Sequence, residues 1–257
     1  MQIERHSFLV TGGASGLGEA VVRAIVGQGG NVVIADLNAA VGETLAKEMG
    51  DNVRFVRCDV TSGDEVQAAI DVAEKEFGGL QGSINCAGIV VVQKLLDREN
   101  NPADLDTFSR GVNINLVGSF NVARLVAASI AKRITNASQK NVDNGIIINT
   151  ASIAAFDGQV GQGSYGSSKA GVVGLTLPLA RELSRHGIRV MTIAPGVFAT
   201  PMMDSIPEEA RGQLEASVPY PKRMGDPKEF AKLVTHIIDN AYLNGEVIRL
   251  DGAIRMI

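Results

Sequence analysis

The sequence predicts an α/β protein built on one doubly wound sheet of seven parallel strands with helices on both faces. Short apolar runs alternate with helix-periodic segments along all 257 residues, as expected for βαβ units. Hydrophobic residues make up 45% of the chain and aromatic residues only 4%, so Val, Ile, Leu and Ala must fill the core, as in buried parallel strands. The first apolar run also ends in closely spaced glycines, which favours a phosphate-binding turn.

The expected elements follow one another without a repeat, a low-complexity stretch or a break in composition. Strands are expected at 8–11, 31–36, 53–60, 82–85, 146–149, 187–196 and 245–252. Helices are expected at 19–28, 39–49, 64–77, 105–134, 165–184 and 227–240. Residues 1–257 are therefore interpreted as one domain. The long amphipathic connection at 197–223 predicts a substrate lid, and the polar stretches 97–104 and 136–145 predict surface connections.

Composition argues against several classes of function. The net charge is −4 and no long basic run is present, so nucleic-acid binding is not expected. Cys58 and Cys86 fit a reducing compartment, and His6, His186 and His236 lack the spacing of a metal site. No apolar run reaches membrane-spanning length and the N-terminal stretch leaves no room for a signal peptide. A cytoplasmic protein is expected, with a mitochondrial matrix as the alternative.

The glycine-rich turn follows the first strand directly. Gly12, Gly16 and Gly18 have the spacing Gly-x-x-x-Gly-x-Gly, which is neither the common dinucleotide fingerprint nor a Walker loop. Glycines let a backbone approach a ligand closely, and the amides at the start of the next helix favour an anion. We interpret the turn as a pyrophosphate site, with a plain tight turn as the alternative.

An acidic residue, Asp36, ends the second strand. At this distance from the glycines, its carboxylate can accept hydrogen bonds from the adenosine ribose. The same charge repels a 2′-phosphate, and no Lys or Arg lies at 12–18 or 37–39. This pattern predicts NAD rather than NADP as the cofactor, although Asp at a strand end is also a common helix cap.

A hydroxyl, a phenol and an amine mark the centre of the chain. Ser152 ends the fifth strand, and Tyr165 and Lys169 are four residues apart, on one face of the next predicted helix. A phenol titrates near ~10, and a neighbouring ammonium lowers that pKa. The three groups predict proton transfer at an alcohol or a ketone, provided that a cofactor carries the hydride. A half-exposed Tyr and Lys on a helix surface are the alternative.

Three further residues are candidates because of where they stand. Asn115 lies among apolar residues of a long helix, so burial is expected and its amide would need partners. Asp59 and Val60 end the third strand, where they are placed to touch an adenine. A capping or turn role is the alternative for both.

Taken together, the motifs resemble the short-chain dehydrogenase/reductase family over nearly the whole chain, in order and at the family's spacings. Each motif is weak alone, whereas the full set is specific, and it implies a Rossmann-like fold. The motifs that carry the resemblance are Thr11–Gly18, Asn85-Cys-Ala-Gly88, Asn115, Ser152, Tyr165-x-x-x-Lys169 and Pro195-Gly196.

The resemblance implies roles for the matching positions. Tyr165 is the general acid/base, Lys169 lowers its pKa and holds the nicotinamide ribose, Ser152 binds the substrate oxygen, and Asn115 positions a proton-relay water. Implied substrate contacts are Ser152, Gln162 and Tyr165. Implied cofactor contacts are Gly12, Ser15, Gly16, Leu17, Gly18, Asp36, Asp59, Val60, Cys86, Ala87, Gly88, Tyr165, Lys169, Pro195, Phe198 and Thr200.

A narrower resemblance concerns 147–162, 189–196 and 245–256, which are similar to a branch of the family that acts on 3-hydroxyacyl-CoA and hydroxysteroids. It implies an NAD-dependent dehydrogenase for a secondary alcohol, assembled as a homotetramer. A 3-oxoacyl-carrier-protein reductase is one alternative, against which Asp36 argues. A non-catalytic nucleotide-binding scaffold is the other, and loss of Ser152, Tyr165 or Lys169 would have indicated it.

Overall fold

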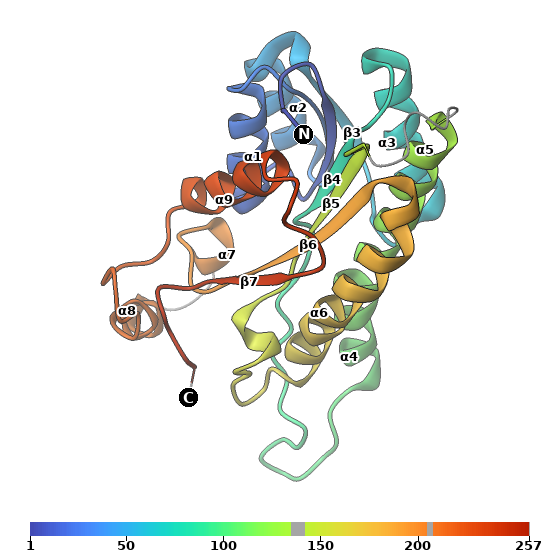
Figure 1. The fold of residues 1–257 in the computed structure, drawn as a ribbon. Coiled ribbons are helices and arrows are strands. Elements are labelled where there is room, and N and C mark those ends of the chain that lie inside the picture. The colour runs from blue at the N-terminus through green and yellow to red at the C-terminus, as the bar shows by residue number, and fades with distance from the viewer. Residues whose placement is uncertain (135–141, 205–207, 257) are drawn as a thin grey trace.

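The protein is a parallel α/β sheet with helices on both faces (Figure 1). The computed structural model describes residues 1–134, 142–204 and 208–256. The seven strands lie in the order β3-β2-β1-β4-β5-β6-β7 and every pair is parallel. Their bounds are β1 Ser7–Thr11, β2 Asn31–Asp36, β3 Val53–Arg57, β4 Gly82–Asn85, β5 Gly145–Thr150, β6 Ile188–Pro195 and β7 Val247–Leu250. The seven strands and the doubly wound sheet expected from the sequence are confirmed.

The helices connect these strands and divide between the two faces of the sheet. Within the described residues they are α1 Gly16–Val26, α2 Ala39–Met49, α3 Gly63–Phe77, α4 Leu105–Val112, α5 Gly118–Arg133, α6 Gly163–Leu183, α7 Pro201–Asp204, α8 Glu208–Ala216 and α9 Pro227–Asp239. Short 3₁₀ turns lie at Gly50–Asn52, Ile153–Ala155 and Ser184–His186. In Figure 1, α1 and α9 lie on one side of the strands, and α5 and α6 lie on the other.

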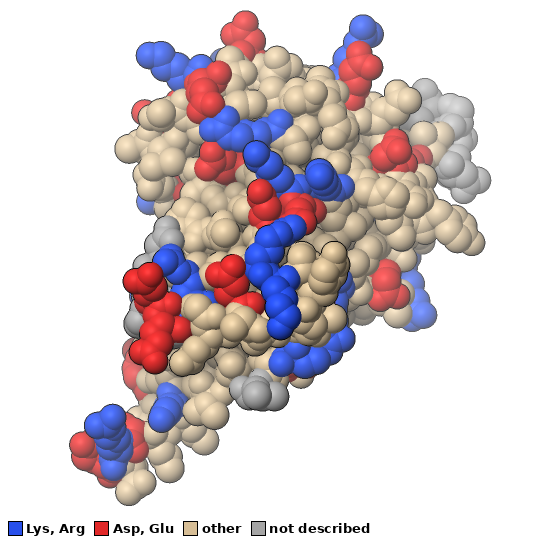
Figure 2. All heavy atoms as spheres, turned by 90° about the vertical axis from the view of Figure 1, so that its left-hand side faces the viewer, with Lys and Arg blue, Asp and Glu red and all other residues tan. Residues whose placement is uncertain are grey.

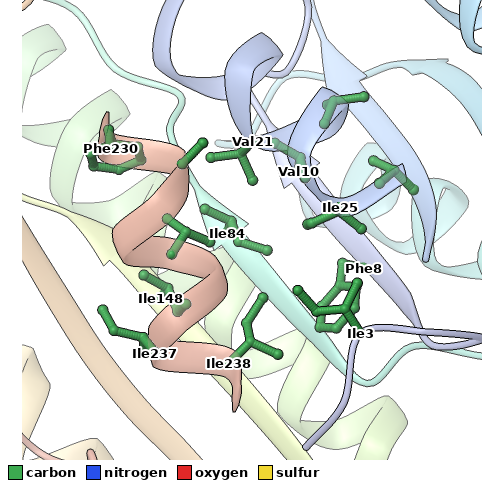
Figure 3. Packing of buried hydrophobic residues seen from close by; sticks show 14 of the residues in the cluster. Ile3, Phe8, Val10, Val21, Ile25, Ile84, Ile148, Phe230, Ile237 and Ile238 are labelled. Carbon is green, nitrogen blue, oxygen red and sulfur yellow. The ribbon is translucent and has the colours of Figure 1, made fainter. Parts of the chain in front are cut away.

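Two apolar clusters hold these layers together. One lies under α1 and α9, where Phe8, Ile84 and Phe230 are fully buried (Figure 3). The other joins the opposite face of the sheet to α3, α5 and α6 and contains Ile70 and Ile147. Aliphatic side chains dominate both clusters, as the composition predicts. The two buried faces explain why the strands read as continuous apolar runs.

Strand order reverses between β1 and β4. From β1 the chain continues to β2 and β3 on one side, and from β4 it continues to β5, β6 and β7 on the other. Loops after β1 and β4 therefore diverge, and a crevice at such a switch point is where open α/β sheets bind ligands. The candidate residues after β1, β2, β4 and β5 all lie at this edge of the sheet.

The long helix expected at 105–134 differs from the prediction in one respect. Between α4 and α5 the chain makes a π-helical turn at Asn113–Val117. Such turns are rare and recur at functional sites. By length and composition alone the run Leu105–Arg133 could cross a membrane, with a mean hydropathy of 1.4 in its most apolar window, but half of that window is buried in the fold. The run packs as a core helix.

The two connections expected from composition are only partly described. The segment expected as a lid, 197–223, contains α7 and α8, and its residues 205–207 lie outside the described residues. Most of the polar stretch 136–145 also lies outside them. Figure 2 shows the face that carries α8 and α9, where Lys and Arg side chains are interspersed with Asp and Glu rather than gathered into one patch.

A buried arginine fastens α9 to the sheet. Arg189 of β6 is 6% exposed. Its guanidinium donates to both carboxylate oxygens of Asp143, each at 3.0 Å. It also donates to the carbonyls of Ile237, Ile238, Asn240 and Leu243 at 2.8–3.3 Å. The last carbonyls of a helix have no partner within it; here the Met1 ammonium and the Leu243 amide also donate to the carbonyls of Ile238 and Asn240. One side chain thus caps the helix and pairs a half-buried acid.

We expect Arg189→Met to destabilise the protein by about 2–3 kcal/mol, because it removes the donor of several carbonyls and one of the two cations paired with Asp143, the other being the Met1 ammonium. Urea unfolding measures this loss. The matched control is Arg23→Met, since Arg23 makes ion pairs on an exposed surface and should cost at most about 1 kcal/mol. Equal losses in the two variants would contradict the role given to Arg189.

Candidate active site

The glycine-rich turn is packed too tightly for side chains. Gly12 has φ +63° and Gly16 has φ +56°, a region that favours glycine. A Cβ on Gly12 would lie 2.8 Å from the backbone nitrogen of Ala87, and one on Gly18 would collide with the carbonyl oxygen of Gly12. Gly12 is therefore required by the close approach of the β1 and β4 turns, Gly16 by its backbone conformation, and Gly18 by the packing of the start of α1 on Gly12.

The start of α1 leaves room for an anion. Ser15 is the N-cap, and among the described residues its side chain makes no capping hydrogen bond. The first amides of a helix have no partner within the helix. Ser15 is exposed, and Gly16 and Leu17 are half-buried, so these amides can reach a ligand. The turn therefore has the features of the pyrophosphate site that the sequence predicts.

Asp36 lies beside this turn at the end of β2. One carboxylate oxygen accepts a hydrogen bond from the Ala14 amide at 3.1 Å, and the other accepts one from the Asn38 amide at 2.9 Å. Asn38, and not Asp36, caps α2. The two backbone bonds fix the orientation of the carboxylate while each oxygen keeps a lone pair for a ribose hydroxyl.

The segment after β6 covers the turn from the other side. A Cβ on Gly16 would lie 3.4 Å from the side chain of Thr200, so Thr200 is in reach of a ligand on the turn. Phe198 differs, because its ring is 6% exposed and packs edge-on against Phe230 at 6.4 Å. The cofactor contact that the resemblance implies for Phe198 stays a prediction. Pro195 ends β6 opposite Leu250.

Asp59 and Val60 lie after β3 on the same edge of the sheet. Asp59 accepts hydrogen bonds from the amide and the hydroxyl of Thr61 at 2.9 and 2.7 Å. Val60 is 6% exposed, and its carbonyl accepts from the Asn121 side chain at 2.8 Å. The turn role is thus present in the contacts, and the adenine contact stays a prediction.

The turn after β4 brings two candidate groups together. A Cβ on Gly88 would lie 2.9 Å from Oδ1 of Asn115 and 3.3 Å from Nζ of Lys169. Only a glycine leaves space for both side chains. Ala87 connects this turn to β1, because its amide donates to the Thr11 hydroxyl at 3.2 Å. The absence of a side chain at Gly88 therefore leaves room for the side chains of Asn115 and Lys169.

Asn115 is fully buried and its amide is satisfied. Its Oδ1 accepts from the Ile89 amide at 2.8 Å, and its Nδ2 donates to the Ile89 carbonyl at 2.9 Å and to Ser168 Oγ at 3.0 Å. These bonds confirm the expected burial with partners. They join the π-helical turn to the β4 turn and to α6. The side chain positions the catalytic helix, and a relay water remains a prediction.

Lys169 is a buried ammonium with one backbone partner. It is 4% exposed, and Nζ donates to the Thr150 carbonyl at 2.8 Å. Burial lowers the pKa of Lys169 to about 8. Cys86 lies nearby, where burial raises the pKa of its thiol to about 11 and the Thr150 hydroxyl approaches Sγ at 3.6 Å. The alternative of an exposed Lys on a helix surface is wrong.

Tyr165 and Ser152 face one another across the turn after β5. Burial raises the pKa of Tyr165, and a hydrogen bond with Ser152 acts in the opposite direction. Ser152 Oγ also accepts from the Ala154 amide at 3.1 Å. Nζ of Lys169 lies 5.9 Å from the centre of the phenol ring. In the protein alone the pKa of Tyr165 is therefore raised. The sequence predicts instead that the ammonium of Lys169 lowers it. A lowered pKa stays a prediction for the cofactor complex.

Gln162 stands at the entrance to this site. It precedes α6, and its Oε1 accepts from the Gln159 amide at 2.9 Å. Its backbone pairs with Gln93 in an isolated parallel bridge. The loop after β4 and the loop before Tyr165 are thus joined here. The substrate contact predicted for Gln162 remains untested.

Three residues of the site were missed from the sequence. The Thr150 carbonyl accepts a hydrogen bond from Lys169, and the Thr11 hydroxyl accepts one from the Ala87 amide and so joins the β1 and β4 turns. Ser168 Oγ accepts a hydrogen bond from the Asn115 side chain. Thr11 opens the glycine motif, but no role could be assigned to it from the sequence, and Ser168 acts through a small hydroxyl that no motif requires. Thr150 directly follows Asn149 at a strand end, and that position was the only available signal.

The residues present fit a bound dinucleotide. The evidence is the glycine cradle that Cβ atoms would fill, the oriented carboxylate of Asp36 and the amine of Lys169 at the β4 turn. The fold and this site define a dinucleotide-dependent α/β oxidoreductase with a Ser-Tyr-Lys centre. Comparisons with known proteins bear out that class.

The model of the short chain dehydrogenase family matches residues 6–211, and the chain belongs to this family. It is an oxidoreductase that acts on CH–OH groups. A bovine (Bos taurus) protein named 3-hydroxyacyl-CoA dehydrogenase type-2 is 52% identical over 96% of this chain and 94% of its own length.

Two solved structures are also similar. The 3-hydroxyacyl-CoA dehydrogenase type-2 of Mycobacterium avium has a TM-score of 0.91 and 47% identity, covering 98% of this chain and 96% of that one. The 3-ketoacyl-(acyl-carrier-protein) reductase of Brucella melitensis, complexed with NADH, has a TM-score of 0.85 and 26% identity over the full length of both chains. The family resemblance found in the sequence is confirmed.

We expect Tyr165→Phe to lower kcat by about 10²–10⁴-fold, because it removes the only phenol that can exchange a proton with the substrate oxygen. Binding of the reduced cofactor, followed by fluorescence titration, should change little. Tyr242→Phe is the control, since Tyr242 is 99% exposed. Full turnover by the Tyr165 variant would remove this residue from its role.

Proposed function

We propose that the protein interconverts a 3-hydroxyacyl-CoA and the corresponding 3-ketoacyl-CoA with NAD as cofactor. The observation that carries the reaction class is that Ser152 and Tyr165 share a hydrogen bond while the buried Lys169 lies near the phenol ring at the β4 turn. The names of the two similar dehydrogenases support the acyl-CoA substrate. Bound cofactor would supply the hydride to the carbonyl carbon, or accept it in the reverse direction.

The chain's own groups handle the proton. In the direction of reduction, Tyr165 gives its phenolic proton to the substrate oxygen, which becomes the hydroxyl of the product. Ser152 donates a hydrogen bond to the same oxygen while its charge develops. Because burial keeps the phenol of Tyr165 protonated at neutral pH, the site is ready to act as an acid.

Lys169 acts on the phenol and on the ribose side of the site. Its ammonium, held by the Thr150 carbonyl, favours the phenolate that remains after proton transfer. Further protons on Nζ are free to bond a ribose hydroxyl, since an ammonium has three donors. In oxidation the same groups act in reverse, with the phenolate of Tyr165 taking the hydroxyl proton.

Asp36 supports NAD over NADP. Its oxygens are fixed beside the glycine turn, where a carboxylate accepts from ribose hydroxyls and repels a 2′-phosphate. This charge also argues against a carrier-protein reductase that prefers NADPH, although the similar Brucella reductase is complexed with NADH. Hydroxysteroids remain further candidate substrates, and a homotetramer remains a prediction.

The proposal predicts that purified protein oxidises NADH in the presence of acetoacetyl-CoA and works poorly with NADPH. The loss of absorbance of the reduced cofactor measures turnover. Turnover with NADH supports the acyl-CoA substrate. Tight NADH binding without turnover would support NAD as the cofactor but would exclude acetoacetyl-CoA as a substrate. A preference for NADPH would favour the carrier-protein reductase.

The variant that belongs to this experiment is Asp36→Asn. Losing a charged acceptor should weaken NADH binding by about 1.5–3 kcal/mol, or roughly 10- to 100-fold. It should also reduce the difference in affinity between NADH and NADPH. Asp71→Asn is the control, because Asp71 lies on the exposed side of α3. An unchanged cofactor preference in the Asp36 variant would contradict the reading of this carboxylate.

The pH dependence of ketone reduction follows from Lys169. Its ammonium is present below its pKa of about 8 and is lost as the pH rises through that value. The specificity constant kcat/KM for the ketone, at saturating NADH, should therefore be level near neutral pH and fall with an apparent pKa near 8. A constant level up to pH ~9.5, well above that pKa, would show that the charge on Lys169 is not needed.

A further inference from the structure

The stretch 245–256 contributed to the sequence resemblance, but none of the roles above uses it. It contains the edge strand β7, followed by a turn with positive φ at Gly252 (+57°) and Ala253 (+67°). The turn folds the chain back toward the catalytic loop. Figure 1 shows β7 beside β6 and the chain turning away from the sheet after β7.

Arg249 of β7 reaches the turn that follows Ser152. Its Nη2 donates to Oδ2 of Asp157 at 2.6 Å, and its guanidinium lies 5.2 Å from the centre of the Phe156 ring. The arginine is itself held by Asp251, whose Oδ2 accepts from Nε at 2.7 Å. Nη2 also donates to the Ile254 carbonyl at 3.1 Å. One side chain thus joins β7, the turn after it and the catalytic loop.

The contact is transmitted to Ser152 through a short 3₁₀ turn. The amides of Phe156 and Asp157 both donate to the Ile153 carbonyl at 2.9 Å. Ser152 accepts from Ala154 at the other end of this turn. These bonds connect Asp157 to the 3₁₀ turn that Ser152 caps, so a shift of Asp157 can be passed on to the Ser152 hydroxyl.

The same stretch also fixes the end of the segment 197–223. Ile254 packs with Val218 and Ile153 in a buried cluster, and the three side chains are 1%, 4% and 2% exposed. The Tyr220 amide donates to the Gly252 carbonyl at 3.3 Å. A Cβ on Gly252 would lie 2.6 Å from Val218. The catalytic loop and the proposed substrate segment are thus joined through one surface.

We propose that Arg249 is a positioning residue for the reaction: with Asp251 and Ile254 it holds the Ser152 turn against the end of the segment 197–223. This inference rests on the proposed oxidoreductase function, because it concerns the alignment of Ser152 with Tyr165. Arg249 does not touch the reacting atoms. It acts through the Ser152 hydroxyl and through the wall of the substrate site.

An alternative is that these ion pairs are ordinary surface contacts. Arg249 argues against it, because its side chain is 22% exposed and makes two carboxylate contacts, a carbonyl contact and a ring contact. Arg255 is a natural comparison. It binds the same Asp251 oxygen at 3.1 Å but is 59% exposed, and its charge acts on Asp157 more weakly than that of Arg249 does.

The test compares Arg249→Met, Arg249→Lys and Arg255→Met in the full chain. We expect Arg249→Met to lower kcat/KM for the ketone by about 10- to 100-fold, as a small misplacement of a catalytic group does. The dissociation constant of NADH should stay within about twofold, since Arg249 is remote from the glycine turn. Lys at 249 should recover part of the loss, and Arg255→Met should stay within about twofold of the unmutated protein.

A second measurement needs no substrate. Arg211, Lys222 and Arg223 lie in the segment 197–223, so trypsin should cut there faster in Arg249→Met than in Arg255→Met. Unchanged cutting, an equal loss of activity in both Met variants, or a parallel loss of NADH binding would overturn the proposal. If the unmutated protein reduces no ketone, the proposed function fails, and the rate of cutting still decides the role of Arg249.

Discussion

The site depends on the burial of one ammonium group. Among the described residues, the Thr150 carbonyl is the one hydrogen-bond partner of Lys169. Its buried charge is therefore costly, which explains its lowered pKa. The cost is tolerated because the charge is needed where a phenolate forms. Gly88 and Asn115 shape the space around the amine, and Asn115 belongs to the π-helical turn between α4 and α5.

Close backbone packing is the second constraint, and it connects cofactor binding with catalysis. The glycines of the β1 turn bring it against the β4 turn, and the Thr11 hydroxyl bonds the Ala87 amide. The β4 turn in turn contacts Asn115 and Lys169. Parts of the site that are far apart in the sequence therefore form one continuous framework. A change in the glycine turn would therefore shift the β4 turn, and through Gly88 the surroundings of the Lys169 amine.

Much of this framework could be predicted from the sequence, because local patterns determine it. Alternating apolar runs specified all seven strands, and the glycine spacing located the turn that Asp36 faces. The π-helical turn could not be predicted, since it arises from tertiary bonds of Asn115 to the β4 turn and α6. The direction of the Tyr165 shift also depends on burial, which spacing alone does not reveal.

The role of Arg249 also could not be predicted from the local sequence. Its sequence neighbours predict a strand and contribute to the family resemblance, but they give Arg249 no role, because its partner Asp157 lies 92 residues earlier in the chain. A residue that works through a distant turn has no local signature, so only the folded arrangement can identify it. The turn after β7 contacts both the 3₁₀ turn that follows Ser152 and the segment 197–223. We therefore infer that the alignment of Ser152 depends on the edge strand, which lies four places from β1 in the sheet.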